Sequence, residues 1–99
     1  MTKKPTKPKK PKRAVIPAAT ATVDGVYDIL ARDLGLPKHF GRNLDALYDA
    51  LTGDVAGPVE IVVEDAKALR RALGPAAAPL LKALADAAKA RRDLTVHLR

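Results

Sequence analysis

Two aspartates, Asp45 and Asp49, could together bind a cationic partner in this chain of 99 residues. They stand four positions apart in a stretch with helical periodicity, so they share one face of the expected helix. Like charges at that spacing destabilise a helix by about 0.2 to 0.5 kcal/mol, and the helix dipole offsets this only for Asp45, in the first turn. Local stability therefore does not require Asp49. Either the pair is a solvated acidic face or it binds a cationic partner.

Residues that support catalysis or metal binding are otherwise scarce. The chain has no cysteine, no serine and no glycine pattern of a phosphate-binding loop. Its two histidines, His39 and His97, are 58 positions apart and cannot form a metal-binding pair at helical spacing. His39 could act as a general base oriented by Asp45 or Asp49, although an exposed loop histidine explains it better. We expect His97 on the open face of a terminal strand, and we expect no enzymatic activity, cofactor or metal.

The net charge of +7 is concentrated at the N-terminus. Of the 18 lysines and arginines, seven lie in residues 1–13 without any acid, and the other 11 match the 11 acids of residues 14–99. Lysine alternating with proline offers nothing to bury, which predicts a disordered arm over 1–13 and one domain over 14–99. The arm either keeps the chain soluble or binds nucleic-acid phosphates, and the second reading would make this a small RNA-associated protein.

Hydrophobic periodicity divides the domain into three strands and four helices. Strands are expected at 14–16, 59–63 and 94–98, and helices at about 24–34, from Asn43 to 51, from Asp65 to Gly74-Pro75, and onward with Pro79 in the first turn. The strand 59–63 is apolar almost throughout, as in a strand that is covered on both faces. The order β-α-α-β-α-α-β predicts an α/β fold in which a three-stranded parallel sheet packs against four helices.

The segment from Leu36 to Gly53 carries the most specific pattern in the chain. The segment begins with Leu36-Pro37, followed by aromatic-like residues and Gly41. It continues with Asn43-Leu44-Asp45-Ala46-Leu47, then Tyr48 and Asp49, and it ends with Leu51-Thr52-Gly53. This pattern resembles the barstar family, bacterial intracellular inhibitors of the secreted ribonuclease barnase. The similarity extends from Ala14 to Leu98 with the same order of elements. It implies a non-enzymatic inhibitor, or an antitoxin-like immunity protein.

The resemblance also implies how such a protein would act: the helix that carries Asp45 and Asp49, with the loop before it, would block a ribonuclease active site. Carboxylates would stand where RNA phosphates bind, held by charge-assisted hydrogen bonds to arginine. Asp49 would be the main contact, with Asp45 beside it. The other residues implied at the interface are His39, Gly41, Asn43, Leu44, Tyr48, Thr52, Gly53, Asp54 and Asp86. The expected partner is a small basic extracellular-type ribonuclease, bound one to one by a cytoplasmic protein that is a monomer when free.

Several positions depart from the family pattern, mostly by loss of a large aromatic residue. His39 replaces a tyrosine, Tyr48 and Asp54 replace tryptophans, and Ala90 replaces a second acid on the last helix. Because aromatic residues often dominate protein interfaces, these changes indicate a partner whose rim differs from that of barnase. Asp86, where the family has a glutamate, either contacts the partner or pairs with Lys82 or Lys89 within its helix.

Overall fold

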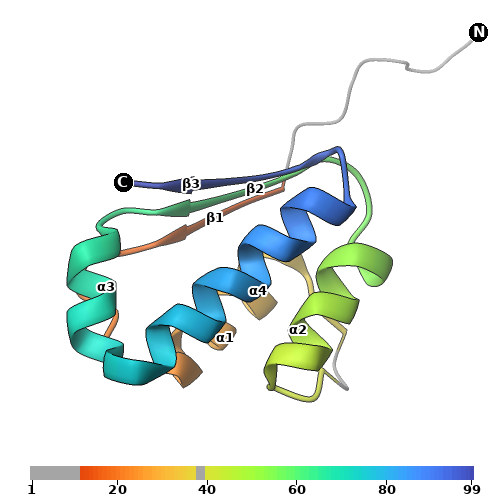
Figure 1. The fold of residues 1–99 in the computed structure, drawn as a ribbon. Helices are drawn as coiled ribbons and strands as arrows, with labels where there is room; N and C mark the ends of the chain where they lie inside the picture. Colours follow the sequence, from red (N-terminus) through yellow and green to blue (C-terminus); the bar gives the residue numbers. More distant parts are fainter. Residues whose placement is uncertain (1–11, 38–39) are drawn as a thin grey trace, which may run out of the picture.

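The computed structural model describes residues 12–37 and 40–99, and within them a three-stranded sheet carries every helix on one of its faces (Figure 1). The elements are β1 (Lys12–Ile16), α1 (Val23–Leu34), α2 (Leu44–Asp49) with the π-helical turn η1 (Ala50–Asp54), β2 (Val59–Val63), α3 (Ala66–Leu73), the 3-10 turn η2 (Gly74–Ala76), α4 (Ala77–Ala90) and β3 (Leu94–Leu98).

The sheet is parallel throughout, in the order β1-β2-β3, which confirms the predicted three-stranded parallel sheet. Its register places Ile61, at the centre of β2, between Ala14 of β1 and Val96 of β3. Parallel neighbours need long crossovers, and the helices supply them. The bounds of β2 and β3 are those predicted, since both are short apolar runs with turn residues at their ends.

The predicted break between a third and a fourth helix is wrong. The 3-10 turn η2 connects α3 directly to α4, so that the two form one bent helical run. Counted as joined, the helices number three in the described residues and the order is β-α-α-β-α-β. Gly74 has φ of 62°, which allows the bend. Pro75 does not interrupt the run, because it lies at the start of a helical turn. The backbone N–H of a residue at that position has no partner within the helix, so its absence in proline costs nothing.

Two further boundaries differ from expectation. The helix that was expected to stop at Thr52-Gly53 continues through Asp54 as the turn η1. Strand β1 begins at Lys12 rather than at Ala14, so its first two residues belong to the stretch 1–13 that was predicted as an arm. Residues 1–11, the rest of that stretch, lie outside the described residues.

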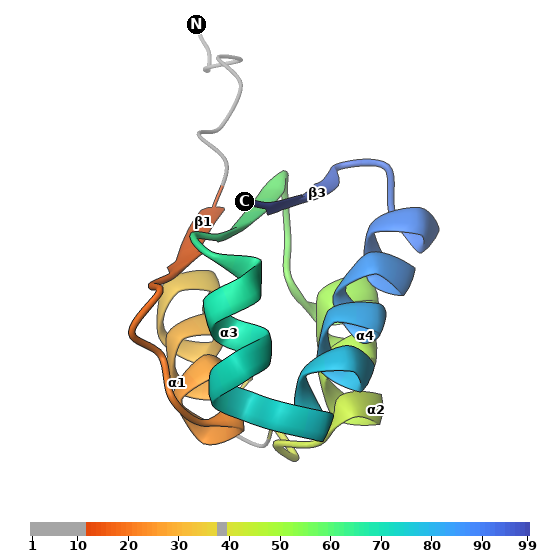
Figure 2. The ribbon, with the colours of Figure 1, turned by 60° about the vertical axis from the view of Figure 1, so that its left-hand side comes forward.

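The core lies between the inner face of the sheet and the helices. Figures 1 and 2 show that no described helix covers the other face, so the expectation that β2 is covered on both faces is wrong. Val62 lies on this outer face, yet it is only 1% exposed, because Val15 and His97 flank it in register. Glu60, also on the outer face, pairs with Arg13 and with His97, each at 3.1 Å. The predicted position of His97 on an open sheet face is confirmed. Among the described residues no helix is long and apolar enough to cross a bilayer.

Candidate partner-binding surface

Asn43 sets the start of α2, the helix that carries Asp45 and Asp49. Its Oδ1 accepts a hydrogen bond from the backbone N–H of Ala46 at 2.8 Å, as an N-cap side chain does. Leu47 is fully buried and fixes the rotation of the helix against the core. Asp45, Tyr48 and Asp49 therefore face outward, and all three are exposed.

The loop before α2 is fastened to α1 by Arg42. The Arg42 Nη2 donates to Oδ1 of Asp24 at 3.0 Å and to Oδ1 of Asp28 at 2.8 Å, and the guanidinium lies 5.7 Å from the centre of the Tyr27 ring. Phe40 packs edge-on against the same ring, with the centroids 5.5 Å apart. The hydrogen bonds to the two carboxylates raise the pKa of Arg42 above its ordinary value, so the cation persists. These contacts hold Arg42 at φ of 56° and determine where α2 begins.

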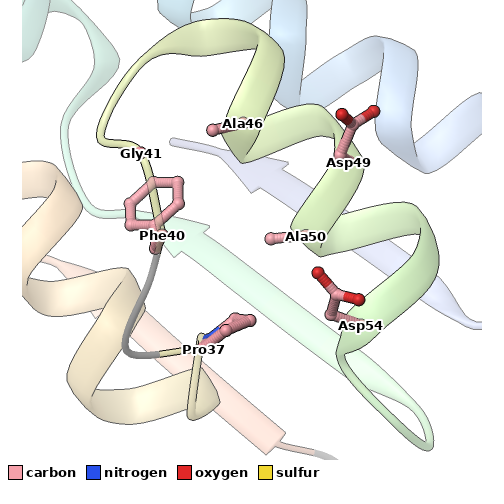
Figure 3. Close-up of a pocket in the computed structure, with 7 residues that line it drawn as sticks. All are labelled: Pro37, Phe40, Gly41, Ala46, Asp49, Ala50 and Asp54. Carbon is pink, nitrogen blue, oxygen red and sulfur yellow. The ribbon is translucent and has the colours of Figure 1, made fainter.

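A hollow of about 220 Å³ lies between this loop and the outer side of α2 and η1 (Figure 3). Its lining consists of Pro37, Phe40, Gly41, Ala46, Asp49, Ala50 and Asp54. Pro37 and Phe40 form one side, the side chains of Ala46 and Ala50 point towards them from the other, and Asp49 and Asp54 lie beyond these alanines on the same helical run (Figure 3). A cationic group with an apolar stem suits such a hollow, because the stem can cover the apolar wall while the charge meets the carboxylates.

Gly41 lets the loop approach α2 closely at this hollow. A Cβ at this position would lie 3.2 Å from Nδ2 of Asn43 and 3.3 Å from Cβ of Ala46, closer than side chains normally pack. A larger residue would therefore require Asn43 or Ala46 to shift by a few tenths of an ångström. The predicted site residue Gly41 lines the first hollow.

A second hollow, of about 290 Å³, lies between α2 and α4. Its lining consists of Leu44, Asp45, Tyr48, Pro79, Lys82, Ala83 and Asp86. Here Asp86 accepts a hydrogen bond from Nζ of Lys82 at 2.9 Å, one helical turn away. Of the two interpretations of Asp86 that the sequence left open, the pair within the helix is present. Contact with a partner stays a prediction for this residue.

The turn η1 places the last predicted site residues. The backbone N–H of Val55 donates to the carbonyl of Ala50, five residues back, at 3.1 Å, which makes the turn π-helical. Thr52 uses its hydroxyl internally, because Oγ1 donates to the carbonyl of Tyr48 at 2.7 Å. Gly53 is exposed, and an added Cβ would meet nothing within 4 Å. The described part of the chain therefore gives no steric reason for glycine at position 53. Single π-turns within helices are frequent at functional sites.

Of the five acids that form no ion pair with the described residues, three lie on α2 and η1. Six acids form ion pairs: Asp24, Asp28, Asp33, Glu60, Asp86 and Asp93. Glu64 accepts a hydrogen bond from the backbone N–H of Ala18, and Asp65 caps α3. The remaining acids, Asp45, Asp49 and Asp54, are exposed and form no ion pair or side-chain hydrogen bond with any residue in 12–37 or 40–99.

The structure brings most of the predicted site residues onto one surface. We call the segment from Gly41 to Asp54 the acidic segment. It holds Gly41, Asn43, Leu44, Asp45, Tyr48, Asp49, Thr52, Gly53 and Asp54. Asp86 faces it from α4 across the second hollow, and His39 lies outside the described residues. Sequence reasoning missed Pro37 and Phe40 as walls of the first hollow, and Arg42 as the fastening of the loop.

Comparison with known proteins gives two findings. Residues 14–99 match the family model described as Barstar (barnase inhibitor). The chain is also 34% identical over 71 residues to "Putative ribonuclease inhibitor YrdF" of Bacillus subtilis (strain 168), a stretch that covers 72% of this chain and 78% of that protein.

Proposed function

We propose, for a chain that belongs to the barstar family of non-enzymatic ribonuclease inhibitors, how it inhibits its target. Its acidic segment inserts into the active site of a small basic ribonuclease and blocks it. The observation that carries the proposal is the set of three exposed carboxylates of Asp45, Asp49 and Asp54, which form no ion pair with residues 12–37 or 40–99 and have a hollow beside them. A ribonuclease active site binds phosphates with cationic side chains, so a carboxylate can take the place of a phosphate there. Opposite fields would also accelerate the encounter of the two proteins.

Within this proposal the site residues divide by what their side chains already do. Asp49 and Asp54 meet the partner's cations at the first hollow, and Asp45 and Tyr48 face it beside the second. The side chains of Asn43 and Thr52 hold the acidic segment in shape through their internal hydrogen bonds. Asp86 contributes less, because Lys82 already neutralises it.

The rest of the proposal concerns the complex and the cell. We propose a one-to-one complex formed by a monomeric inhibitor in the cytoplasm. The departures from the family pattern favour a cognate ribonuclease other than barnase itself. Binding of nucleic acid through residues 1–13 stays a prediction, since nearly all of that stretch lies outside the described residues.

Titration of ribonuclease activity tests this function. Increasing amounts of the protein are added to barnase and to a panel of small basic secreted ribonucleases, and RNA cleavage is measured at each step. We expect cleavage by at least one of them to fall to zero at an equimolar ratio. The triple variant Asp45→Asn, Asp49→Asn, Asp54→Asn is the control, because these exposed carboxylates form no hydrogen bond or ion pair with the described residues. If the triple variant inhibits as well as the parent, the acidic segment is not the inhibitory surface. Inhibition that requires a fixed ratio of protein to RNA, rather than to enzyme, would support the nucleic-acid alternative.

Gly53 offers a prediction in which stability and binding change in opposite directions. Gly53→Ala should raise the free energy of unfolding by roughly 0.5 kcal/mol, because alanine loses less backbone entropy in a helical turn. The same methyl group should weaken ribonuclease binding at least tenfold, about 1.4 kcal/mol, by overpacking the interface. Urea unfolding and the dissociation constant of the complex measure the two effects.

Gly35→Ala is the matched control for that variant. Gly35 ends α1 at φ of 70°, where alanine is strained, and open space surrounds it as it does Gly53. This control should lose stability and keep its affinity for the ribonuclease. Gly53 would have no role at the interface if Gly53→Ala bound as tightly as the parent.

A further inference from the structure

Arg91, at the end of α4, reaches across to the end of the acidic segment. Its Nη1 donates to the backbone carbonyls of Leu51 and Val55, and its Nη2 donates to that of Gly57. The three acceptors lie 34 to 40 positions earlier in the chain. The side chain of Arg91 is only 14% exposed. One guanidinium therefore ties α4 to the turn η1 and to the loop that follows it.

The π-helical geometry of η1 explains why the carbonyl of Leu51 needs an outside donor. In an α-helix the N–H of Val55 would donate to the carbonyl of Leu51, four residues back. Here that N–H donates to the carbonyl of Ala50 instead, at 3.1 Å. The carbonyl of Leu51 receives the Nη1 of Arg91 at 2.9 Å in its place. Helix ends leave carbonyl groups unpaired, and a buried carbonyl without a donor costs free energy.

Asp93 neutralises Arg91 locally. Its carboxylate accepts from Nε and Nη2 of the same guanidinium. These hydrogen bonds hold the pKa of Asp93 below its ordinary value, although partial burial opposes the shift. Because Arg91 and Asp93 form a bidentate pair, the cation adds little positive potential to the nearby acidic segment. Arg91 can thus support the turn without weakening the field that Asp49 and Asp54 create.

We infer that Arg91 is a positioning residue of the proposed inhibitor, which holds the turn η1 in the geometry that presents Asp49 and Asp54 at the first hollow. The inference rests on the proposed function, since positioning has a purpose only if this surface binds a partner. Arg91 itself does not meet the partner, because its donors are occupied by carbonyls and by Asp93 within the fold. It acts on binding through the backbone of the acidic segment.

Amide hydrogen exchange in the free protein tests the first half of the inference. Arg91→Met removes the donors and keeps an unbranched apolar side chain of moderate length. We expect the amide of Val55 to exchange roughly tenfold faster relative to that of Ile61 in β2, which reports global opening. Arg92→Met is the matched control, since Arg92 is exposed and its side chain forms no hydrogen bond or ion pair with the described residues. An unchanged ratio of the two exchange rates would overturn the inference, whatever the protein binds.

Affinity for the ribonuclease tests the second half. Arg91→Met should weaken the complex about tenfold, because the charge-assisted hydrogen bonds that fix the turn are lost. In a background with Asp49→Ala and Asp54→Ala the same change should weaken it less than twofold, since the groups that Arg91 positions are gone. A merely structural role would lower affinity equally in both backgrounds, and that result would contradict the inference.

A conservative variant guards against loss of folding. Arg91→Lys keeps the charge but presents a single nitrogen instead of a planar fork, so it can reach only part of the carbonyl set. We expect its exchange ratio and its affinity to fall between those of the parent and of Arg91→Met. Arg91→Lys could match Arg91→Met in exchange ratio and affinity while Arg91→Lys unfolds at the same urea concentration as the parent. In that case the positive charge at position 91 does not help to hold the turn η1. If the parent inhibits no ribonuclease at all, the proposed function fails, and the exchange ratio still decides whether Arg91 holds the turn.

Discussion

Replacing Asp49 with alanine should weaken ribonuclease binding by about two to three and a half orders of magnitude, because the cations that face it in the complex would be buried without a counter-charge. Removing one partner of a buried ion pair costs about 3 to 5 kcal/mol, and each 1.4 kcal/mol is a factor of ten in the dissociation constant. The fold should not suffer. Asp49 is exposed and its side chain forms no hydrogen bond or ion pair with the described residues, and its loss relieves repulsion from Asp45. Isothermal titration against the inhibited ribonuclease gives the affinity, and urea unfolding gives the stability.

The control for Asp49→Ala is a change of the same charge elsewhere. Glu64→Gln removes one negative charge at the end of β2 and keeps an oxygen that can accept from the N–H of Ala18. This variant should bind within a factor of about two of the parent, since a distant surface charge acts only through the screened field. Equal losses in the two variants would mean that net charge, rather than the position of Asp49, determines affinity.

Leu47 supports the same surface from beneath, and Leu47→Ala should lower the free energy of unfolding by about 2 to 5 kcal/mol. Leu47 is fully buried, and its helix packs against α4. A small domain has roughly 5 to 15 kcal/mol of stability in total, so this one change should remove a large fraction of it. The midpoint and slope of urea unfolding, followed by circular dichroism, measure the loss.

Leu44→Ala is the comparison on the same helix. Leu44 is half-buried and lines the hollow between α2 and α4. Its truncation should cost about 1 kcal/mol of stability, the usual scale for a partly buried side chain, and should reduce affinity because the hollow changes shape. Our assignment of the inward and outward faces of α2 would be wrong if Leu44→Ala destabilised the fold more than Leu47→Ala.

The strands were predictable from the sequence because their signals are local. Val59–Val63 is a β-branched apolar run and Leu94–Leu98 alternates, and both coincide with the observed strands. The start of α2 was equally predictable, since Asn43 is a good N-cap and it caps the helix as expected. The acidic pair on that helix could be recognised from spacing alone.

The missed features depend on contacts between distant parts of the chain. In the turn η1 the carbonyl of Leu51 accepts a hydrogen bond from Arg91, which lies 40 positions later in the chain. The loop before α2 requires Asp24 and Asp28 of α1, which pair with Arg42 across at least 14 positions. No periodicity or cap signal encodes such pairs. The prediction of a break between α3 and α4 failed for a different reason. Gly-Pro usually ends a helix, and here Gly74 and Pro75 bend it instead.

The extra residue in the turn η1 also suggests how specificity could change between relatives. In a regular α-helix each residue advances by about 100° around the axis, so Asp54, five residues after Asp49, would stand about 140° away from it. The wider π-helical turn instead keeps both residues at the same hollow. Inserting one further residue beside Thr52 or Gly53 would turn Asp54 away from Asp49, and a single added codon could thus redirect this protein towards a different nuclease with no substitution in its core.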